Sequence, residues 1–497
     1  MNYRSTRNSR ESVSSAQAIA HGISVDGGLF VPESIPSVSL DDLQMLTGKS
    51  YVERAEFVLS KYLTDFTAEE LHYCVSNAYN TQNFDSESIV ELAHLYNGNY
   101  MLELWHGPTC AFKDMALQLL PYLLTTSVKK VIDDKKVVIL VATSGDTGKA
   151  ALEGFKDVEG TQILVFYPED GVSAMQKRQM ITQEGSNVAV CAIQGNFDDA
   201  QTGVKKIFTD EATRQLLADN KMMFSSANSI NWGRLVPQIV YYISAYCELV
   251  KNKEIALGEE INIVVPTGNF GNILAAYYAK RMGLPVKKLI CASNKNKVLT
   301  DFINTGIYDR KRDFYTTISP SMDILISSNL ERLLYEISGC DDELIRDWFQ
   351  QLSVDGNYRV TDEVKAKIQQ DFVGGFCDDE QTKQTIHDTF QTYSYLCDTH
   401  TAVALHVCEE YKKATGDNTK TLIASTASPY KFSASVLEAI APGVSVSDEF
   451  EGVALLHELS KLPVPDGLSG LKGKEVRFKG SVSVQEMPAV VREMLGV

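Results

Sequence analysis

Hydrophobic residues in the middle and later parts of the chain form short continuous runs, and each run is followed by a stretch with helical patterning. Uninterrupted apolar runs of this length are typical of strands that are buried on both faces of a sheet. The runs lie at 137–143, 163–168, 187–194, 222–227, 261–269, 287–294 and 421–428. Helices are expected between them, for example from about Thr147 and across Met175 to Gln183. This alternation predicts an α/β fold with open parallel sheets that are covered by helices on both faces.

The first part of the chain, about residues 1–96, has a different pattern. A turn-like stretch, SVDGGLFVPESIP, is followed by the amphipathic segments LDDLQMLTG and SYVERAEFVLSKYL. The sequence Ser-Leu-Asp-Asp near position 40 has the features of a helix start. We therefore expect an N-terminal domain that is mainly helical.

Length and composition indicate a globular protein of two or three domains. The chain has 497 residues, of which 44% are hydrophobic and 22% charged. It has no apolar run long enough to cross a membrane. The net charge of −17 disfavours nucleic acid and anionic membranes as partners, because such a surface repels them. A small anionic ligand can still bind in a locally positive cleft.

The cysteines and histidines give no sign of disulfides or a metal site. The chain has nine cysteines, an odd number, and they form no CxxC pair. This usage is typical of reduced thiols, so we expect a cytoplasmic protein. The eight histidines form no HExxH motif, and His400 and His406 are too far apart for one helical face, so no metal is expected. The N-terminus lacks the apolar segment of a signal peptide.

A candidate reactive lysine follows a predicted strand. Lys113 lies in HGPTCAFKD (106–114), directly after the strand-like NYMLELW. A lysine amine forms a Schiff base with an aldehyde cofactor when it is unprotonated near neutrality. Desolvation by Phe112 and Trp105 would lower its pKa in the required direction. The alternative interpretation is a surface lysine after a turn.

Two glycine-containing turns follow predicted strands and are candidate anion sites, since backbone N–H groups at a helix N-terminus attract negative charge. TSGDTG (143–148) suits an amino-acid carboxylate, and TGNFGN (267–272) suits a phosphate. The first is not a P-loop, because that motif needs Gly at 143 and Ser or Thr at 150, where the chain has Thr143 and Ala150. Ordinary capped turns are the alternative in both cases.

Two further segments carry polar side chains at strand ends. In ASTASP (424–429), the hydroxyl of Ser425, Thr426 or Ser428 could face a heteroaromatic nitrogen. SSANSINWGR (225–234) combines amide, hydroxyl and guanidinium groups that suit a phosphate ester, namely Asn228, Ser229, Asn231 and Arg234. Lys177 and Arg178 could add positive charge, although a solvated helix face also explains them. Ligands of open α/β sheets bind beyond the carboxyl ends of the strands, so all these segments are expected to form one site.

Taken together, the motifs resemble the threonine synthase family, in its long microbial and fungal form. HGPTCAFKD, TSGDTG, SSANSINWGR, VPTGNFGN and STASPYKF occur in that order. GLFVPESIP, SMDILISSNLERLLYE and KEVRF also resemble this family, and the similarity extends from about residue 3 to residue 480. The chain departs from many members at Thr399, Ser428 and Tyr430, since many have Pro in place of Thr399 and read TAHPAKF where this chain reads TASPYKF.

The resemblance implies a fold-type II pyridoxal-phosphate enzyme, similar to the tryptophan synthase β subunit. It implies an N-terminal domain at 1–96, a large cofactor-binding domain at 97–130 and 232–475, a small substrate domain at 131–231, and a C-terminal segment at 476–497. Pyridoxal 5′-phosphate would be bound by Lys113, Gly268, Asn269, Phe270, Gly271, Asn272, Thr426 and Asp146. The substrate would be bound by Thr143, Ser144, Thr147, Lys177, Asn228, Ser229, Asn231 and Arg234.

The implied reaction converts O-phospho-L-homoserine and water to L-threonine and phosphate, the last step of threonine biosynthesis. Lys113 would take the Cα proton, loss of a Cβ proton would expel the γ-phosphate, and water would add at Cβ. A monomer or homodimer is expected. Alternatives are a related dehydratase or phospho-lyase that releases 2-oxobutyrate, and a catalytically inert binding protein on the same scaffold.

Overall fold

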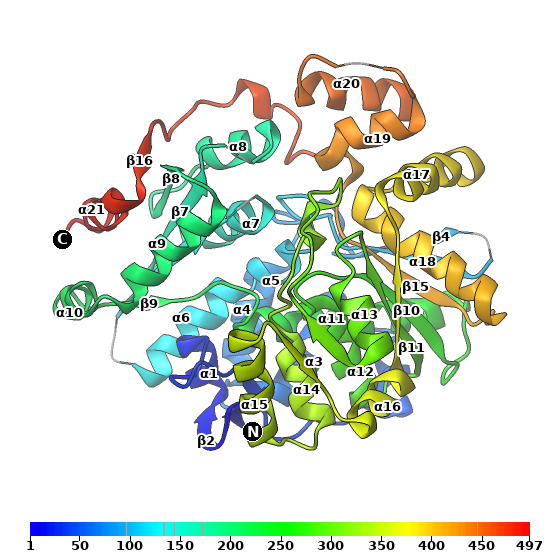
Figure 1. The fold of residues 1–497 in the computed structure, drawn as a ribbon, viewed down its shortest axis with the longest axis horizontal. Coiled ribbons are helices and arrows are strands. Elements are labelled where there is room, and N and C mark those ends of the chain that lie inside the picture. The colour runs from blue at the N-terminus through cyan, green and yellow to red at the C-terminus, as the bar shows by residue number, and fades with distance from the viewer. Residues whose placement is uncertain (96, 133–134, 144, 171, 445) are drawn as a thin grey trace.

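The protein contains two large β-sheets that lie beside each other, one parallel and the other parallel except for one edge strand, with helices packed on both (Figure 1). The computed structural model describes residues 1–95, 97–132, 135–143, 145–170, 172–444 and 446–497. Among these residues, no helix combines the length and the apolar character needed to cross a membrane. The sheets carry the sequence motifs described above at their carboxyl edges, so their topology positions the candidate site.

The larger sheet has the strand order β14-β11-β10-β15-β5-β4. Its strands are β4 (Glu91–Leu95), β5 (Asn99–Glu103), β10 (Ile261–Pro266), β11 (Val286–Ser293), β14 (Phe372–Phe376) and β15 (Thr421–Ser425). Neighbouring strands are parallel except for β4, which pairs with β5 in the antiparallel direction. Because β4 precedes residue 96, the large sheet recruits a strand from within the range that we assigned to the N-terminal domain.

The smaller sheet is parallel and has the order β16-β8-β7-β6-β9. Its strands are β6 (Lys136–Ala142), β7 (Thr161–Pro168), β8 (Val188–Gln194), β9 (Met222–Ser225) and β16 (Ser481–Ser483). Strand β16 comes from the C-terminal segment and pairs with β8 at the sheet edge. The helix after it, α21 (Met487–Leu495), lies beside this sheet at the left of Figure 1.

Alternation along the strands explains why helices cover both faces of each sheet. In β10, Ile261, Ile263 and Val265 belong to one hydrophobic cluster, whereas Val264 belongs to another, formed with α18 (Thr399–Thr415). Successive side chains of a strand point to opposite faces, so a strand that is apolar throughout must be covered twice. All six residues of β10 are buried accordingly.

The helices that position the site begin at or close to the ends of the strands. They are α5 (Asp114–Leu117), α7 (Asp146–Phe155), α8 (Ala174–Ile181), α11 (Trp232–Lys251) and α12 (Gly271–Met282). The remaining helices of the two sheet regions are α6 (Leu120–Val131), α9 (Phe197–Thr209), α10 (Glu211–Asp219), α13 (Val298–Thr305), α14 (Leu330–Ile337), α15 (Asp342–Val354), α16 (Asp362–Asp371), α17 (Asp379–Tyr393), α19 (Ser433–Ile440) and α20 (Glu449–Ser460). Short elements complete the fold: β12 (Ile307–Asp309), β13 (Asn357–Arg359), η1 (Pro320–Met322), η2 (Pro429–Phe432), η3 (Leu471–Gly473) and η4 (Val484–Glu486).

The N-terminal region combines an antiparallel sheet with helices. Its sheet has the order β2-β1-β3, and its elements are β1 (Asn2–Ser5), β2 (Asn8–Ser14), α1 (Ser15–His21), β3 (Phe30–Pro32), α2 (Leu40–Leu46), α3 (Tyr51–Tyr62) and α4 (Ala68–Ala78). The predicted helix start near position 40 is confirmed, since Ser39 caps α2 and forms a capping box with Asp42. The small sheet was not expected from the sequence.

Candidate active site

Three of the motifs meet at the carboxyl edge of the larger sheet. The segments after β5, β15 and β10 carry Lys113, Thr426 and the glycine turn respectively, and these strands are parallel neighbours. The segment with Lys113 runs beside the end of β15, because Phe112 N donates to Thr426 O at 2.8 Å. Parallel strands end at the same edge of a sheet, so this topology brings the motifs together.

Lys113 has the properties of a reactive amine. Its side chain is half-buried, and Nζ makes no hydrogen bond or ion pair with any described residue. Burial lowers the pKa of Lys113, and the positive charges of Lys431 and Arg234 lower it further, against the opposing effect of Asp146 and Asp114. A lysine with a lowered pKa is more often neutral, and the neutral amine is the nucleophile.

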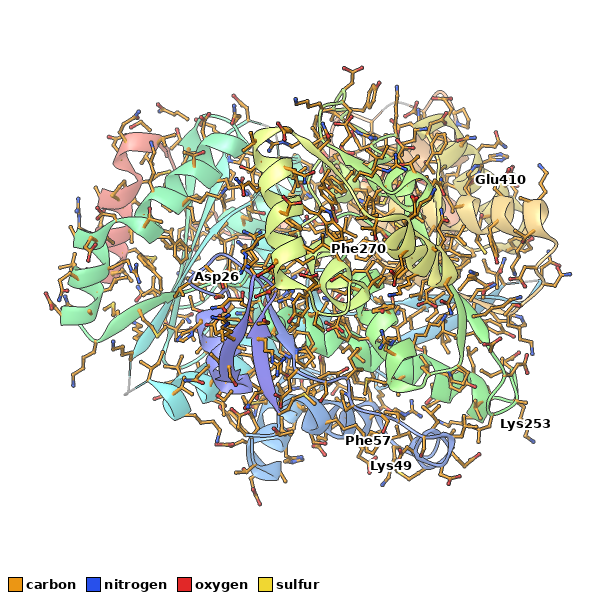
Figure 2. The ribbon with its side chains drawn as sticks, turned by 60° about the horizontal axis from the view of Figure 1, so that its bottom comes forward. Asp26, Lys49, Phe57, Lys253, Phe270 and Glu410 are labelled. Carbon is orange, nitrogen blue, oxygen red and sulfur yellow. The ribbon has the colours of Figure 1, made fainter. Side chains whose placement is uncertain are left out.

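The glycine turn presents unused backbone donors at the N-terminus of α12. Phe270 has the left-handed value φ = 63°, which turns the chain into the helix, and the residue is buried near the centre of the view in Figure 2. Within the described residues, the N–H groups of Asn269, Phe270, Gly271 and Asn272 donate to no acceptor. Free N–H groups combined with the helix dipole form an anion site.

The carbonyl side of this turn is held by the segment that follows η1. Ser327 Oγ donates to Gly268 O at 2.8 Å, and Asn329 N donates to Asn269 O at 3.1 Å. A Cβ at Gly268 would lie 2.5 Å from Ser321 O, so only glycine fits there. The turn is therefore fixed from one side, while its N–H groups remain available on the other.

Asn272 adds a further unused donor. Its Oδ1 accepts hydrogen bonds from Tyr242 and, at 2.6 Å, from Tyr241. Its Nδ2 is buried and has no hydrogen-bond partner among the described residues. A buried donor without an acceptor is costly, so this amide favours an anionic guest beside the turn.

The hydroxyls at the end of β15 are not equivalent. Ser425 Oγ accepts from Trp105 Nε1 at 3.1 Å and from Thr401 Oγ1 at 3.3 Å. Ser428 Oγ caps η2 by accepting from a backbone N–H. Thr426 Oγ1 has no hydrogen bond within the described part of the chain, although the residue is 6% exposed. The geometry therefore favours Thr426 as the hydroxyl that is free for a ligand.

The loop before α7 is shaped by one of its own hydroxyls. Thr143 Oγ1 accepts from the backbone N–H groups of Gly145 and Gly148, each at 3.0 Å, and the residue is buried. Thr147 is half-buried, and its side chain makes no hydrogen bond to a described residue. Ser144, which we also expected in this site, lies outside the described residues. Thr143 thus supports the loop, and Thr147 keeps a free hydroxyl.

Asp146 is held in a buried ion pair that the sequence did not reveal. Its Oδ1 lies 2.8 Å from Lys431 Nζ and accepts from Gln176 Nε2 at 3.1 Å. Burial alone would raise the pKa of Asp146, but the ammonium groups of Lys431 and Lys113 hold that pKa well below its usual range. Lys431 lies within the STASPYKF motif, yet nothing in that motif indicates a partner nearly three hundred residues earlier in the chain.

Arg234 is a buried cation that has no counterion among the described residues. The residue is 4% exposed, and its Nη1 donates to Ala227 O at 2.5 Å. Its Nε has no partner and no described carboxylate forms a salt bridge with it, while burial lowers the pKa of Arg234 to about 10. An unpaired buried charge is strongly unfavourable, so Arg234 is poised to receive an anion.

Asn231 supports the fold at this junction. Its Nδ2 donates to Ile19 O and Ser226 O, both at 3.0 Å, and its Oδ1 accepts from Gly233 N at 2.9 Å. Both amide protons are therefore used, and no donor remains for an anionic substrate. This arrangement favours a capping role for Asn231 over the substrate contact that we expected.

The other candidates are more accessible. Asn228 is exposed, and Ser229 Oγ lies 3.4 Å from Ser328 Oγ. Lys177 is half-buried on α8, and its ammonium has no partner among the described residues. Arg178 on the same helix donates instead to backbone carbonyls of residues 471–474, including Lys472 O at 2.7 Å. Of these two cations, only Lys177 is available to a ligand.

Comparison with known proteins identifies the family. Models described as "Threonine synthase N terminus", "Pyridoxal-phosphate dependent enzyme" and "Threonine synthase, C-terminal" match residues 2–79, 91–361 and 401–491. Threonine synthase from Saccharomyces cerevisiae is 34% identical over 523 residues, covering 99% of this chain and 98% of that protein. This chain belongs to the threonine synthase family. Fold-type II architecture, with a helix-rich N-terminal region, is confirmed.

Solved structures and a second group of relatives support the same family assignment. The structure of "PLP bound Threonine synthase from Brucella melitensis" matches with a TM-score of 0.88 and 34% identity, covering 99% of both chains. The yeast structure matches with a TM-score of 0.89 and 32% identity, covering 100% of this chain and 99% of that one. Human threonine synthase-like 1 is 42% identical over 435 residues, which are 86% of this chain. The chain spans 58% of the length of that relative.

The residues at the sheet edge fit the cofactor of this family. Pyridoxal phosphate needs an amine for its aldehyde and donors for its phosphate, and Lys113 and the glycine turn provide these groups. The orphaned amide of Asn272 lies in the glycine turn, and the free hydroxyl of Thr426 lies in the motif after β15, beside the segment that carries Lys113. The fit of the cofactor rests on hydrogen-bonding groups that have no partner within the described part of the chain.

Proposed function

We propose that this protein converts O-phospho-L-homoserine and water to L-threonine and phosphate with the help of pyridoxal phosphate. The observation that carries the proposal is that a lysine amine with no hydrogen bond or ion pair to a described residue lies at the same sheet edge as a turn of unused N–H donors. The relatives named threonine synthase, which match over nearly the full chain, support the same reaction.

Four groups would hold the cofactor. The N–H groups of residues 269–272 and the amide of Asn272 would bind its phosphate, Lys113 its aldehyde, and Thr426 its ring nitrogen. When bound, the cofactor supplies an electron sink for negative charge that develops on the carbons of the amino acid. A neutral hydroxyl such as Thr426 can hydrogen-bond to the ring nitrogen without forcing it to stay protonated, as a carboxylate would.

Substrate binding would use the two clusters of free donors outside the cofactor turn. The N-terminus of α7, with Thr147, would bind the amino-acid carboxylate. Arg234 and Lys177 would bind the phosphate ester and stabilise the negative charge that grows on the leaving phosphate. Arg234 suits this task because no described carboxylate competes for its guanidinium.

Lys113 would move the protons of the reaction. Its lowered pKa lets neutral Nζ accept a proton from the substrate Cα, and the resulting ammonium can return a proton to Cα when the product forms. A proton leaves Cβ as phosphate leaves Cγ, Cγ then gains a proton, and the hydroxyl of water adds at Cβ. The sum is one phosphohomoserine and one water consumed for one threonine and one phosphate.

The decisive experiment is incubation of the holoenzyme with O-phosphohomoserine, with phosphate, threonine and 2-oxobutyrate quantified in the same samples. We expect phosphate and threonine in equal amounts. Equal phosphate and 2-oxobutyrate would instead identify a phospho-lyase, and no product from a protein that carries the cofactor would overturn the proposal. Lys113→Ala serves as the control and is expected to lose both turnover and the visible absorbance of the bound cofactor.

We further propose a cytoplasmic location and a monomer or homodimer. All nine cysteines lie in the described part of the chain and are free thiols, which supports a reducing compartment. Fractionation of the source cells and light scattering of the purified protein test the two statements separately.

A further inference from the structure

Lys431 is a buried lysine to which the proposed function gives no role. It lies in η2, just beyond the end of β15, and its side chain is 1% exposed. Its Nζ donates to Asp146 Oδ1 at 2.8 Å and to Thr109 O at 2.8 Å. Burying an ammonium group is costly in free energy unless the group is paired and hydrogen-bonded. The two partners of Lys431 meet this requirement, so its buried position is a specific feature of the fold at the site.

The Lys431 ammonium joins the two sheet regions beside Lys113. Asp146 begins α7 of the smaller sheet region, whereas Lys431 and Thr109 belong to segments at the edge of the larger sheet. Thr109 in turn fixes Asp114, the residue after Lys113, by donating from its N–H at 2.8 Å and its hydroxyl at 2.6 Å. One ammonium group therefore fixes the chain on both sides of the reactive lysine.

The charges around Lys113 show what this contact does. Four charged groups act on its amine: Asp146 on α7, Lys431 in η2, Arg234 on α11 and Asp114 on α5. The two carboxylates favour the protonated amine, and the two cations oppose them. Asp146 is the carboxylate with the larger effect, and Lys431 is the cation in direct contact with it.

We propose that Lys431 is a positioning residue that fixes the Asp146 carboxylate and offsets its charge, which leaves the Lys113 amine free to react. The proposal rests on the proposed function only in taking Lys113 as the amine that binds the cofactor aldehyde. It assigns to Lys431 no contact with cofactor or substrate.

The test measures Schiff-base formation without any turnover. Apoprotein is titrated with pyridoxal phosphate at a series of pH values, and the visible absorbance gives the pH midpoint of the reaction for each variant. Lys431→Met is expected to move the midpoint up by about one pH unit, because Asp146 then favours the protonated amine unopposed. Asp146→Asn is expected to move it down.

The double variant K431M/D146N gives the most specific test of the contact between the two residues. Removing both charges together should return the midpoint to within about 0.3 pH units of the wild type, because the two effects oppose each other through one contact. Lys431→Arg, which keeps the charge, should also stay close to the wild type. Lys413→Met is the matched control, since the Lys413 side chain is 80% exposed on α18.

Three outcomes overturn the proposal: a midpoint in Lys431→Met no different from that in Lys413→Met, a double variant that shifts as far as Lys431→Met, or a Lys431→Arg variant that shifts as far as Lys431→Met. If Lys431→Met does not fold, the double variant and Lys431→Arg still decide, because neither leaves Asp146 as a lone buried charge. A midpoint about one pH unit above that of Lys413→Met in either variant then overturns the proposal. Failure of the proposed function is separate, since it would show as no threonine from wild-type holoenzyme incubated with O-phosphohomoserine, whatever the pH midpoints of the variants.

Discussion

At the scale of single residues, the site is marked by polar groups that the fold leaves without partners. The Nδ2 of Asn272 and the Nε of Arg234 are buried and make no hydrogen bond within the described residues. Other buried polar atoms without a partner, such as Tyr51 OH and Tyr335 OH, lie away from the motifs at the carboxyl ends of the strands. The Asn272 amide and the Arg234 guanidinium belong to those motifs, so these two groups point to a ligand. The sequence could indicate Lys113 and the glycine turn because each belongs to a local motif. It could not indicate Lys431, whose partner Asp146 is distant in the chain and is brought near only by the packing of the two sheet regions.

Arg234 is expected to be critical for a phosphorylated substrate. Arg234→Gln removes the buried positive charge and should reduce kcat/KM for O-phosphohomoserine about 100-fold or more, the usual effect of losing a donor that stabilises developing charge. Steady-state kinetics with a phosphate-release assay checks this. Arg359→Gln, at a side chain 65% exposed, is the matched control and should leave the kinetics unchanged. Equal values for both variants would remove Arg234 from the site.

His106 makes stability depend on pH above neutrality. Burial alone would lower its pKa, but the carboxylates of Asp85, at 2.6 Å, and Glu103, at 3.0 Å, raise the pKa of His106 to about 9. A folded-state pKa above the unfolded value of about 6.5 means that the stabilisation is fully present below pH 6.5 and is lost as pH rises through about 9. Asp85 is partly exposed to solvent, so we expect an effect of about 1–2 kcal/mol.

The measurement compares urea unfolding of wild type and His106→Gln at pH 6 and pH 10. The two proteins should differ most at pH 6 and converge at pH 10. A difference that stays constant across this range would show that the histidine does not carry the charge there.

At the scale of elements, buried strands were predictable and their ends were less so. All seven apolar runs are strands, because continuous hydrophobicity is what a doubly covered strand requires. The runs at 261–269 and 421–428 extend beyond β10 and β15, since their polar ends form the turns that carry the site. Strand β14 was missed because its sequence FVGGF contains two glycines. Packing explains Gly374, where a Cβ would lie 2.9 Å from Thr300 Cα.

The glycine turn provides a test at this scale. Gly268→Ala would place a Cβ 2.5 Å from Ser321 O, a backbone atom of η1 that cannot move without shifting that helical turn. We expect a loss of stability of about 1–3 kcal/mol and weaker cofactor binding. Gly473→Ala is the control, because a Cβ there meets no atom within 4 Å. Thermal unfolding and a cofactor titration check both variants, and equal behaviour of the two would contradict the close packing.

At the scale of the whole molecule, the C-terminal segment completes the smaller sheet region. Met487, Val491 and Leu495 of α21 pack in the same hydrophobic cluster as Val138 and Leu164 of the sheet. The sequence could not predict that β16 pairs with this sheet or that α21 packs on it. A short strand has no local sequence pattern that identifies the strand with which it pairs. The predicted C-terminal segment, 476–497, therefore contributes to the same hydrophobic cluster as residues of the predicted small domain, 131–231.

Met487 tests how much the segment contributes to stability. The residue is fully buried, and its Sδ would lie 2.4 Å from a Cβ at Gly203, so the contact with α9 is close. Met487→Ala should cost about 2–5 kcal/mol by leaving a cavity. Glu493→Ala, on the exposed side of α21, should cost little. Urea unfolding followed by circular dichroism gives both values, and similar losses would show that the segment adds little to the core.

The position of β16 near the end of the chain also affects how the protein folds during translation. The edge of β8 that it covers is made long before residues 481–483 leave the ribosome, so the nascent polypeptide displays an unpaired row of backbone donors and acceptors throughout that interval. Such an open edge can pair with other chains, and for this protein the period of translation is when self-association is most favoured.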